Sequence, residues 1–220
     1  MAPALFRCEV RKYAKPFILV ISQIDDCTQE WTFLENSIDY VHIRWLLGSV
    51  IDWPALFKQA YKSLAPGGYI ESQEPSASIV SDDGSVHDKS AMTQWGKFFV
   101  EDDIQKKAVE EAGFVDIKEI KFKVSQNTAC LETLVRVLLI LHTQTLVGTW
   151  PQDPKLQEIG TYMRFTLLQD IEGSVNFMAD LAGWTRENIK VYAAHFRREL
   201  LSKDSHPYFW QKAVVGRKPV

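Results

Sequence analysis

Two short segments, residues 38–43 and 69–73, constrain what this chain can fold into more than any other feature. Both contain aromatic and β-branched residues, which favour strands. Between them, apolar residues recur at helical spacing from Asp52 onward. Asp52 can cap a helix, Pro54 suits its first turn, and the Pro-Gly-Gly run at 66–68 can end it. Because a crossover of roughly 25 residues forces parallel pairing, the sequence predicts an α/β fold built on a parallel sheet.

The rest of the chain predicts further elements of both kinds. Apolar residues with alternating or continuous patterns predict strands over residues 17–21, 114–124 and 212–216. Helical spacing, bounded by glycine and capping residues, predicts helices over residues 89–100, 104–112, 154–170, 175–181 and 187–201.

Composition limits the classes of function that need to be considered. The 220 residues, 46% hydrophobic and 24% charged, suit one globular domain spanning residues 1–220. A net charge of −3 gives no support to nucleic-acid binding. The longest apolar tract, residues 131–146, is shorter than the roughly 20 residues that span a bilayer, so no membrane association is expected. Three widely spaced cysteines argue against a disulfide framework and indicate an intracellular location, in the cytoplasm or the nucleus.

Several short motifs together carry a resemblance to a known family. In chain order they are Asp25-Asp26, residues 30–33, 39–44, 52–56, 59–61, 66–68, Gln73-Glu74, residues 111–114, 148–154, 182–184 and 216–219. As a set, these motifs resemble class I S-adenosylmethionine-dependent methyltransferases, and more narrowly the LaeA-like family of fungi. The likeness covers roughly residues 23 to 220.

This resemblance implies a Rossmann-like, mostly parallel sheet of seven strands with a helical cap over residues 154–201. In the family, a glycine-rich turn after the first strand holds the methionine part of the cofactor, and an acid after the second strand binds the ribose. Residues 1–22 hold no counterpart of either feature. We therefore expect an atypical N-terminus over 1–22, a sheet incomplete at its N-terminal strands, and an insertion over 126–147.

An incomplete sheet has a consequence for association. The strand at 38–43 would expose an apolar edge unless residues 17–21 or a second chain cover it. A protein partner or homo-oligomer is therefore an expected possibility.

The same resemblance suggests the candidate site. Asp26 and Cys27 match the position that meets the adenine amino group, although Asp26 is also suited to a turn. Because residues at strand ends line the crevice of α/β sheets, His42 and Arg44 join Asp25, Asp26 and Cys27 as cofactor-binding candidates. His42 and Glu74 are the candidates for catalysis, with a solvated carboxylate as the alternative for Glu74. The spacing of the histidines does not indicate a metal site.

The expected function is methyl transfer from S-adenosylmethionine to a small-molecule or protein acceptor, in fungal secondary metabolism or its regulation. In this interpretation the helical cap encloses an apolar acceptor. Two alternatives remain open. One is a catalytically inactive scaffold or regulatory partner with a methyltransferase-like fold, and the other is a cyclase on this fold that transfers no methyl group.

Overall fold

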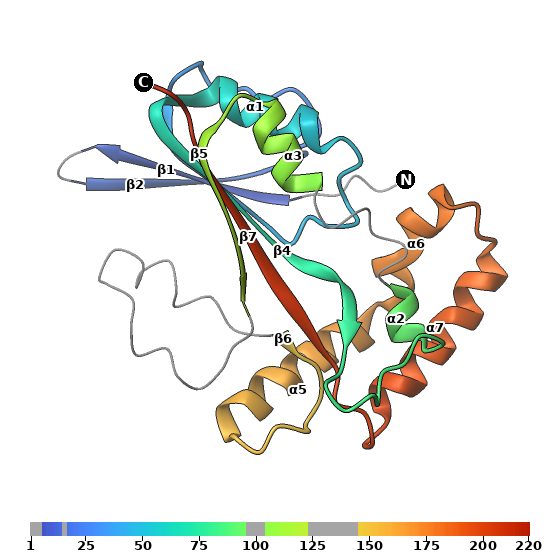
Figure 1. Ribbon diagram of the computed structural model, residues 1–220. Coiled ribbons are helices and arrows are strands. Elements are labelled where there is room, and N and C mark those ends of the chain that lie inside the picture. The colour runs from blue at the N-terminus through green and yellow to red at the C-terminus, as the bar shows by residue number, and fades with distance from the viewer. Residues whose placement is uncertain (1–5, 15–16, 96–103, 123–144) are drawn as a thin grey trace. The chain divides into compact units, whose positions relative to one another are not determined.

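The computed structural model describes residues 6–14, 17–95, 104–122 and 145–220, with the backbone alone over residues 6–25. Figure 1 shows the elements along the chain. Contacts between Cα atoms divide the chain into two compact units. Unit 1 takes in residues 1–74, 102–120 and 213–220, and unit 2 takes in residues 75–101 and 121–212.

Seven strands of the described chain form one sheet in the order β2-β1-β3-β4-β7-β5, and β6 pairs with β7 outside this path. Their bounds are β1 Phe6–Ala14, β2 Phe17–Asp25, β3 Ile38–Arg44, β4 Leu64–Val80, β5 Val115–Phe122, β6 Thr145–Leu146 and β7 Tyr208–Arg217. Helices join these strands, so the expected α/β class is confirmed. The last strand begins four residues earlier than the sequence predicts.

The predicted strand, helix and strand at the centre of unit 1 are present. β3 and β4 pair in parallel, with Tyr40 opposite Tyr69 and Arg44 opposite Gln73. Helix α1, Trp53–Ser63, begins where the Asp52 carboxylate accepts a hydrogen bond from the Ala55 amide at 2.8 Å. The prediction that residues 66–68 end this helix is wrong, because α1 ends at Ser63 and the chain is already extended at Leu64.

Glycine at position 68 has a packing role instead. A Cβ atom there would lie 2.9 Å from the Ala65 carbonyl oxygen and 3.0 Å from that of Asp39. Only glycine lets the backbones approach this closely.

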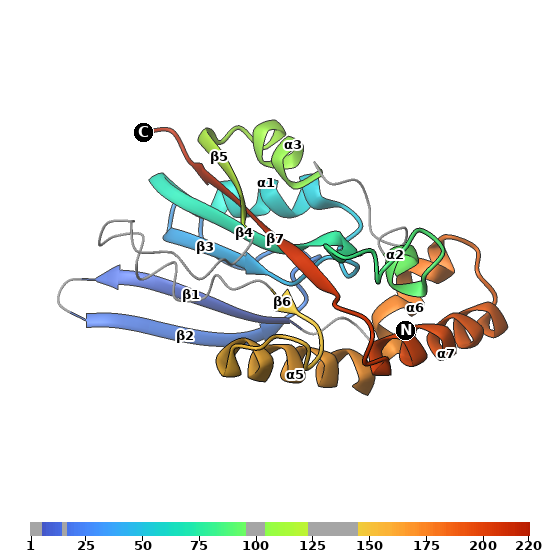
Figure 2. The same cartoon turned by 60° about the horizontal axis from the view of Figure 1, so that its bottom comes forward.

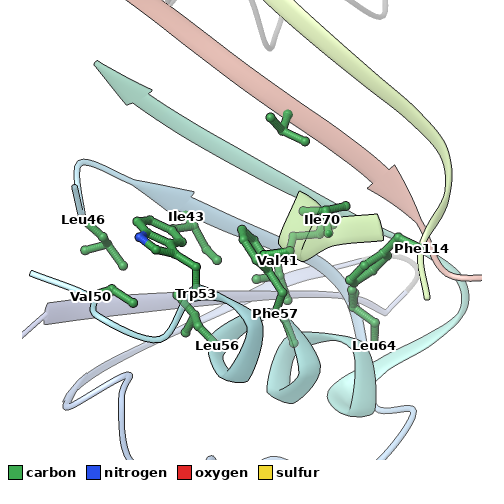
Figure 3. Close-up of a cluster of buried hydrophobic side chains, with 14 of the residues drawn as sticks. Val41, Ile43, Leu46, Val50, Trp53, Leu56, Phe57, Leu64, Ile70 and Phe114 are labelled. Atoms are coloured by element: carbon green, nitrogen blue, oxygen red, sulfur yellow. The ribbon is translucent and has the colours of Figure 1, made fainter. Parts of the chain in front are cut away.

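The core of unit 1 lies on one face of the sheet, under α1 and α3 Ile104–Glu111 (Figures 2 and 3). Figure 3 shows Trp53, Leu56 and Phe57 of α1 among side chains of β3 and β4. Trp53 and Phe57 are 1% and 0% exposed, and their rings stack 5.7 Å apart. Each such side chain contributes roughly 1.5 to 3 kcal/mol through burial.

The N-terminal segment forms a hairpin of two strands, and the sequence predicts only the second of them. The strand expected at 17–21 is present as the longer β2, but β1 is not predicted. β1 pairs antiparallel with β2 and, at Arg11 opposite Tyr40, antiparallel with β3. The edge of β3 is therefore covered by β1, and residues 17–21 lie one strand further out.

The residues at the end of β7 form hydrogen bonds with the start of β4 in unit 1. The Gly67 amide donates to the Lys218 carbonyl at 2.9 Å, and the Lys218 amide donates to the Gly68 carbonyl at 2.8 Å. Because the start of β4 meets the end of β7, these neighbouring strands run antiparallel. The Lys218 ammonium also donates to the carbonyl oxygens of Tyr61 and Leu64, at 2.7 and 2.8 Å. Although Lys218 follows β7, its ammonium group lies at the C-terminus of α1 and binds carbonyl oxygens that have no partner within the helix.

Unit 2 contains four described helices, α2 Ala91–Trp95, α5 Pro154–Gln169, α6 Ile171–Leu181 and α7 Arg186–Leu201. α5 and α7 match their predictions within a residue. α6 begins four residues before its predicted start, because the Asp170 carboxylate caps it through the Gly173 amide at 2.7 Å. No helix among the described residues is long and apolar enough to cross a membrane.

Parts of two predicted segments lie outside the described residues. The helix expected at 89–100 is described as α2 up to Trp95, and residues 96–103 lie outside. Of the expected insertion at 126–147, residues 126–144 lie outside, whereas β6 pairs with β7 through Thr145 opposite Phe209.

Candidate functional site

The ends of β2 and β3 lie at one edge of unit 1, beside the middle of the longer strand β4. Since β1 is antiparallel to both β2 and β3, β2 runs parallel to β3 and β4. Arg11 of β1 pairs with Val20 on one side and Tyr40 on the other. Asp25 lies five residues beyond Val20, and Arg44 lies four residues beyond Tyr40. Asp25 and Arg44 therefore lie within about one residue of each other along the strand direction. Two strand spacings of about 4.8 Å separate their strands. The register thus brings Asp25 and Arg44 to the carboxyl ends of β2 and β3, beside Glu74 within β4. The carboxyl ends of parallel strands are where α/β folds bind ligands.

Asp26 and Cys27 follow this edge in a turn. One carboxylate oxygen of Asp26 accepts hydrogen bonds from the Thr28 amide and hydroxyl, at 2.9 and 2.6 Å. These bonds lower the pKa of Asp26, so the carboxylate is ionised at neutral pH. Cys27 is half-buried, and its carbonyl accepts from the Trp31 indole at 3.0 Å. The turn interpretation of Asp26 is therefore observed, and its contact with adenine stays a prediction.

A second group of polar residues lies on the face of β3 and β4 opposite α1. Glu71 is buried, at 4% exposure, and its carboxylate accepts from the Tyr40 hydroxyl at 2.5 Å. The other carboxylate oxygen lies 3.8 Å from Nδ1 of His42, whose ring stacks on that of Tyr40 with centroids 6.3 Å apart. His42 is exposed. A carboxylate beside an exposed imidazole orients the ring and stabilises its protonated form, so this pair is able to accept a proton.

Glu74 is buried rather than solvated, at 1% exposure. Its two carboxylate oxygens accept hydrogen bonds from the amides of Leu46 and Leu47, at 3.0 and 2.9 Å. Burial raises the pKa of Glu74 to about 8, although these amides and Arg44 favour the charged form. Trp45 lies between the end of β3 and Leu46, and it has a positive φ of 57°. Glu74 thus fastens the loop that connects the carboxyl end of β3 to α1.

Sequence reasoning missed Tyr40 and the pairing of Glu71 with His42. The signal was present, because alternate residues of a strand share a face and Tyr40, His42 and Arg44 therefore lie together. The partner strand could not be aligned from sequence, since the register that sets His42 opposite Glu71 depends on the fold. No three His, Cys, Asp or Glu side chains within the described ranges are grouped to hold a metal ion.

Comparison with known proteins identifies the family. A model described as a methyltransferase domain matches residues 8–119, just over half of the chain. The chain therefore belongs to the methyltransferase domain family. The matched segment contains β3, α1, β4 and all of the candidate site residues.

Curated relatives come from fungi. The chain is 29% identical over 208 residues to methyltransferase pytC of Aspergillus terreus, covering 89% of this chain and 57% of that protein. It is 30% identical over 206 residues to the protein named probable methyltransferase tdiE of Emericella nidulans, covering 91% and 60%. It is 26% identical over 209 residues to the secondary metabolism regulator LAE1 of Cochliobolus heterostrophus, covering 88% and 61%. The chain spans about three fifths of the length of these relatives.

A solved structure gives a weaker likeness. Phosphoethanolamine N-methyltransferase 2 of Haemonchus contortus, in complex with S-adenosyl-L-methionine, matches with a TM-score of 0.41 and 18% identity. The match covers 89% of this chain and 36% of that one. A likeness at this level leaves the function of the chain open.

The residues of unit 1 fit S-adenosylmethionine in part. The carboxyl edge presents acidic and basic residues that suit the hydroxyl and amino groups of an adenosine. Of the described glycines with positive φ, Gly48 lies in the loop from β3 to α1 and Gly84 in the loop from β4 to α2, and each of these loops contains a single glycine. Over the described ranges, a glycine-rich turn for the methionine half is therefore absent.

Proposed function

We propose that this chain takes part in methyl transfer from S-adenosylmethionine to an acceptor in fungal secondary metabolism or its regulation. The observation that carries the proposal is the pair of side chains near the carboxyl end of β3, where an exposed His42 lies beside the buried carboxylate of Glu71 on β4. The family match and the names of pytC, tdiE and LAE1 support it.

Each candidate residue has a role in this proposal. Asp25, Asp26, Cys27 and Arg44 hold the adenosine half of the cofactor, which when bound supplies an electrophilic methyl group. His42 accepts the proton that the acceptor nucleophile loses, and Glu71 stabilises the resulting imidazolium. Glu74 acts as a positioning residue, because it fixes the loop after β3.

One observation favours a second candidate, a methyltransferase-like partner that transfers no methyl group. The described residues lack the glycine-rich turn of the family, so positioning of the methyl donor needs residues beyond this edge. A stable complex with another protein is the result that this alternative predicts.

Calorimetry with S-adenosylhomocysteine tests the proposal. Binding by the purified full chain is the expected result, and ligand at 100 times its Kd should stabilise the protein by about 2.7 kcal/mol. Arg44→Ala should weaken binding, whereas Lys58→Ala, on the exposed face of α1, should not. His42→Ala should keep binding and lose turnover, with an unchanged circular dichroism spectrum.

The absence of binding by a folded sample would make the partner or the cyclase the leading interpretation. Product formation without cofactor turnover would then identify a cyclase, and co-purification with a second chain would identify a partner.

A further inference from the structure

Unit 2 contains a pocket of about 420 Å³ between α2 and α7. Helix α7 lines it with residues three and four positions apart, including Asn188, Val191 and Tyr192, so one face of the helix forms a wall. Figure 1 shows α2 beside this helix. The volume is within the range of roughly 300 to 1,000 Å³ that small-molecule sites occupy. The pocket is therefore large enough for a molecule of two or three fused rings.

The aromatic part of the pocket is held rigidly. Trp184 and Tyr192 meet edge to face, with ring centroids 5.9 Å apart, and Tyr192 stacks on Phe196 at 5.8 Å. The Tyr192 hydroxyl donates to the Ala91 carbonyl at 3.0 Å. Burial and the nearby Glu199 raise the pKa of Tyr192, so it stays a neutral donor. A wall of fixed aromatic rings favours a flat, apolar ligand surface.

The polar groups of the pocket include one cationic side chain, because Lys89 contributes an exposed ammonium group. Gln94 and Asn188 contribute amides that both donate and accept hydrogen bonds, and Nδ1 of the His195 ring lies 2.9 Å from the Arg198 guanidinium. The carboxylate of Glu199 already accepts from the amides of Ala91 and Met92, at 2.8 and 2.9 Å. A ligand that brings an acceptor oxygen therefore matches the lining better than one that brings a cation.

We propose that this pocket binds a planar aromatic molecule that carries a carbonyl or carboxylate oxygen. The ring system lies against Trp184 and Tyr192, and the oxygen accepts hydrogen bonds from Lys89 and the neighbouring amides. This site belongs to unit 2 alone and goes beyond the proposed methyl transfer, whose candidate residues belong to unit 1.

Calorimetric titration of the full chain with 2-naphthoate tests the site, with 2-naphthylmethylamine as a probe of equal shape and opposite charge. The expected result is saturable binding of the carboxylate, weaker binding of the amine, and chemical-shift changes at the Trp184 indole. Val191→Trp should fill the pocket and weaken binding by about tenfold or more. Val191 is 58% exposed, so the larger side chain does not disturb the core.

Matched variants separate the pocket from the rest of α7. Ala194→Trp, at an exposed position that does not line the pocket, should bind 2-naphthoate as the wild type does. Lys89→Met should weaken binding about two- to fivefold, as expected for an exposed charge, while Lys190→Met should have no effect. Asn188→Trp is a second filling variant if Val191→Trp does not fold.

No binding of 2-naphthoate by the folded wild type, equal binding by Val191→Trp, or tighter binding of the amine would each overturn the proposal. Titration of the same samples with S-adenosylhomocysteine keeps the two proposals apart. Loss of nucleoside binding alone would count against the methyltransferase function and leave this pocket unaffected.

Discussion

Glu74 in unit 1 and Glu199 in unit 2 perform the same structural task in different surroundings. Each carboxylate accepts hydrogen bonds from two consecutive backbone amides, Leu46 and Leu47 for Glu74, and Ala91 and Met92 for Glu199. Glu74 fixes a loop at the carboxyl edge of the sheet, and Glu199 fixes the first turn of α2. Glu74 is buried and Glu199 is half-buried. The comparison shows that two hydrogen bonds from backbone amides do not by themselves offset the cost of burying the charge of Glu74.

The largest expected effect concerns the pH dependence at Glu74. Its pKa is about 8 in the folded protein, against 4.5 for an unperturbed carboxyl. Between these values the unfolded chain is ionised while the folded protein keeps the proton, so stability falls as pH rises from about 4.5 to 8. The slope is up to about 1.4 kcal/mol per pH unit. Glu74→Gln should remove this contribution, as measured by urea unfolding at several pH values.

Glu111→Gln, an exposed carboxylate at the end of α3, is the control and should keep the wild-type slope. Equal pH dependence in Glu74→Gln and wild type would show that Glu74 ionises normally.

A smaller effect is expected at Glu199. Glu199→Ala leaves the first amides of α2 without their acceptor, at a cost of about 1 to 2 kcal/mol, as for loss of a helix cap. Amide hydrogen exchange at Ala91 and Met92 should accelerate. Glu187→Ala, in the exposed first turn of α7, should leave exchange in α2 unchanged. Unaltered exchange in Glu199→Ala would contradict the role of this carboxylate.

The smallest effect comes from two tyrosine hydroxyls, one in each unit. Tyr40 donates to the buried carboxylate of Glu71, whereas Tyr192 donates to a backbone carbonyl. Because Tyr40→Phe removes a hydrogen-bond donor from a buried carboxyl group, Tyr40→Phe should cost about 1 kcal/mol more than Tyr192→Phe in chemical unfolding. A reversed order would contradict this ranking of the two hydrogen bonds.

The sequence predicted those parts of the fold in which local pattern and packing agree. The parallel pair β3 and β4, α1 with its Asp52 cap, and the long helices of unit 2 follow from periodicity and capping residues. β1 was missed although apolar and charged residues alternate along it, because its role depends on pairing with Tyr40 far along the chain. The predicted start of α6 is four residues too late, because a glycine such as Gly173 usually indicates the end of a helix. Here the Gly173 amide donates a hydrogen bond to the capping carboxylate of Asp170.

The site was predicted less completely than the fold. The motifs indicate His42, Arg44 and Glu74, and the structure places the first two near the carboxyl end of β3 and Glu74 beside them within β4. The role of Glu74 in fixing the loop after β3 could not be predicted, because its donors are backbone amides. Every residue except proline has such an amide, so the sequence does not indicate which ones Glu74 binds. Glu71 needed the strand register before its proximity to His42 became visible.

The division of unit 1 among three separate segments has a consequence for synthesis. Residues 213–220 supply the carbonyls, amides and the Lys218 ammonium that close α1 and β4, and they follow all of unit 2 in the chain. A ribosome releases these residues after residues 121–212 have already emerged. The domain that contains the candidate site can therefore complete its sheet only after the chain of unit 2 has been synthesised.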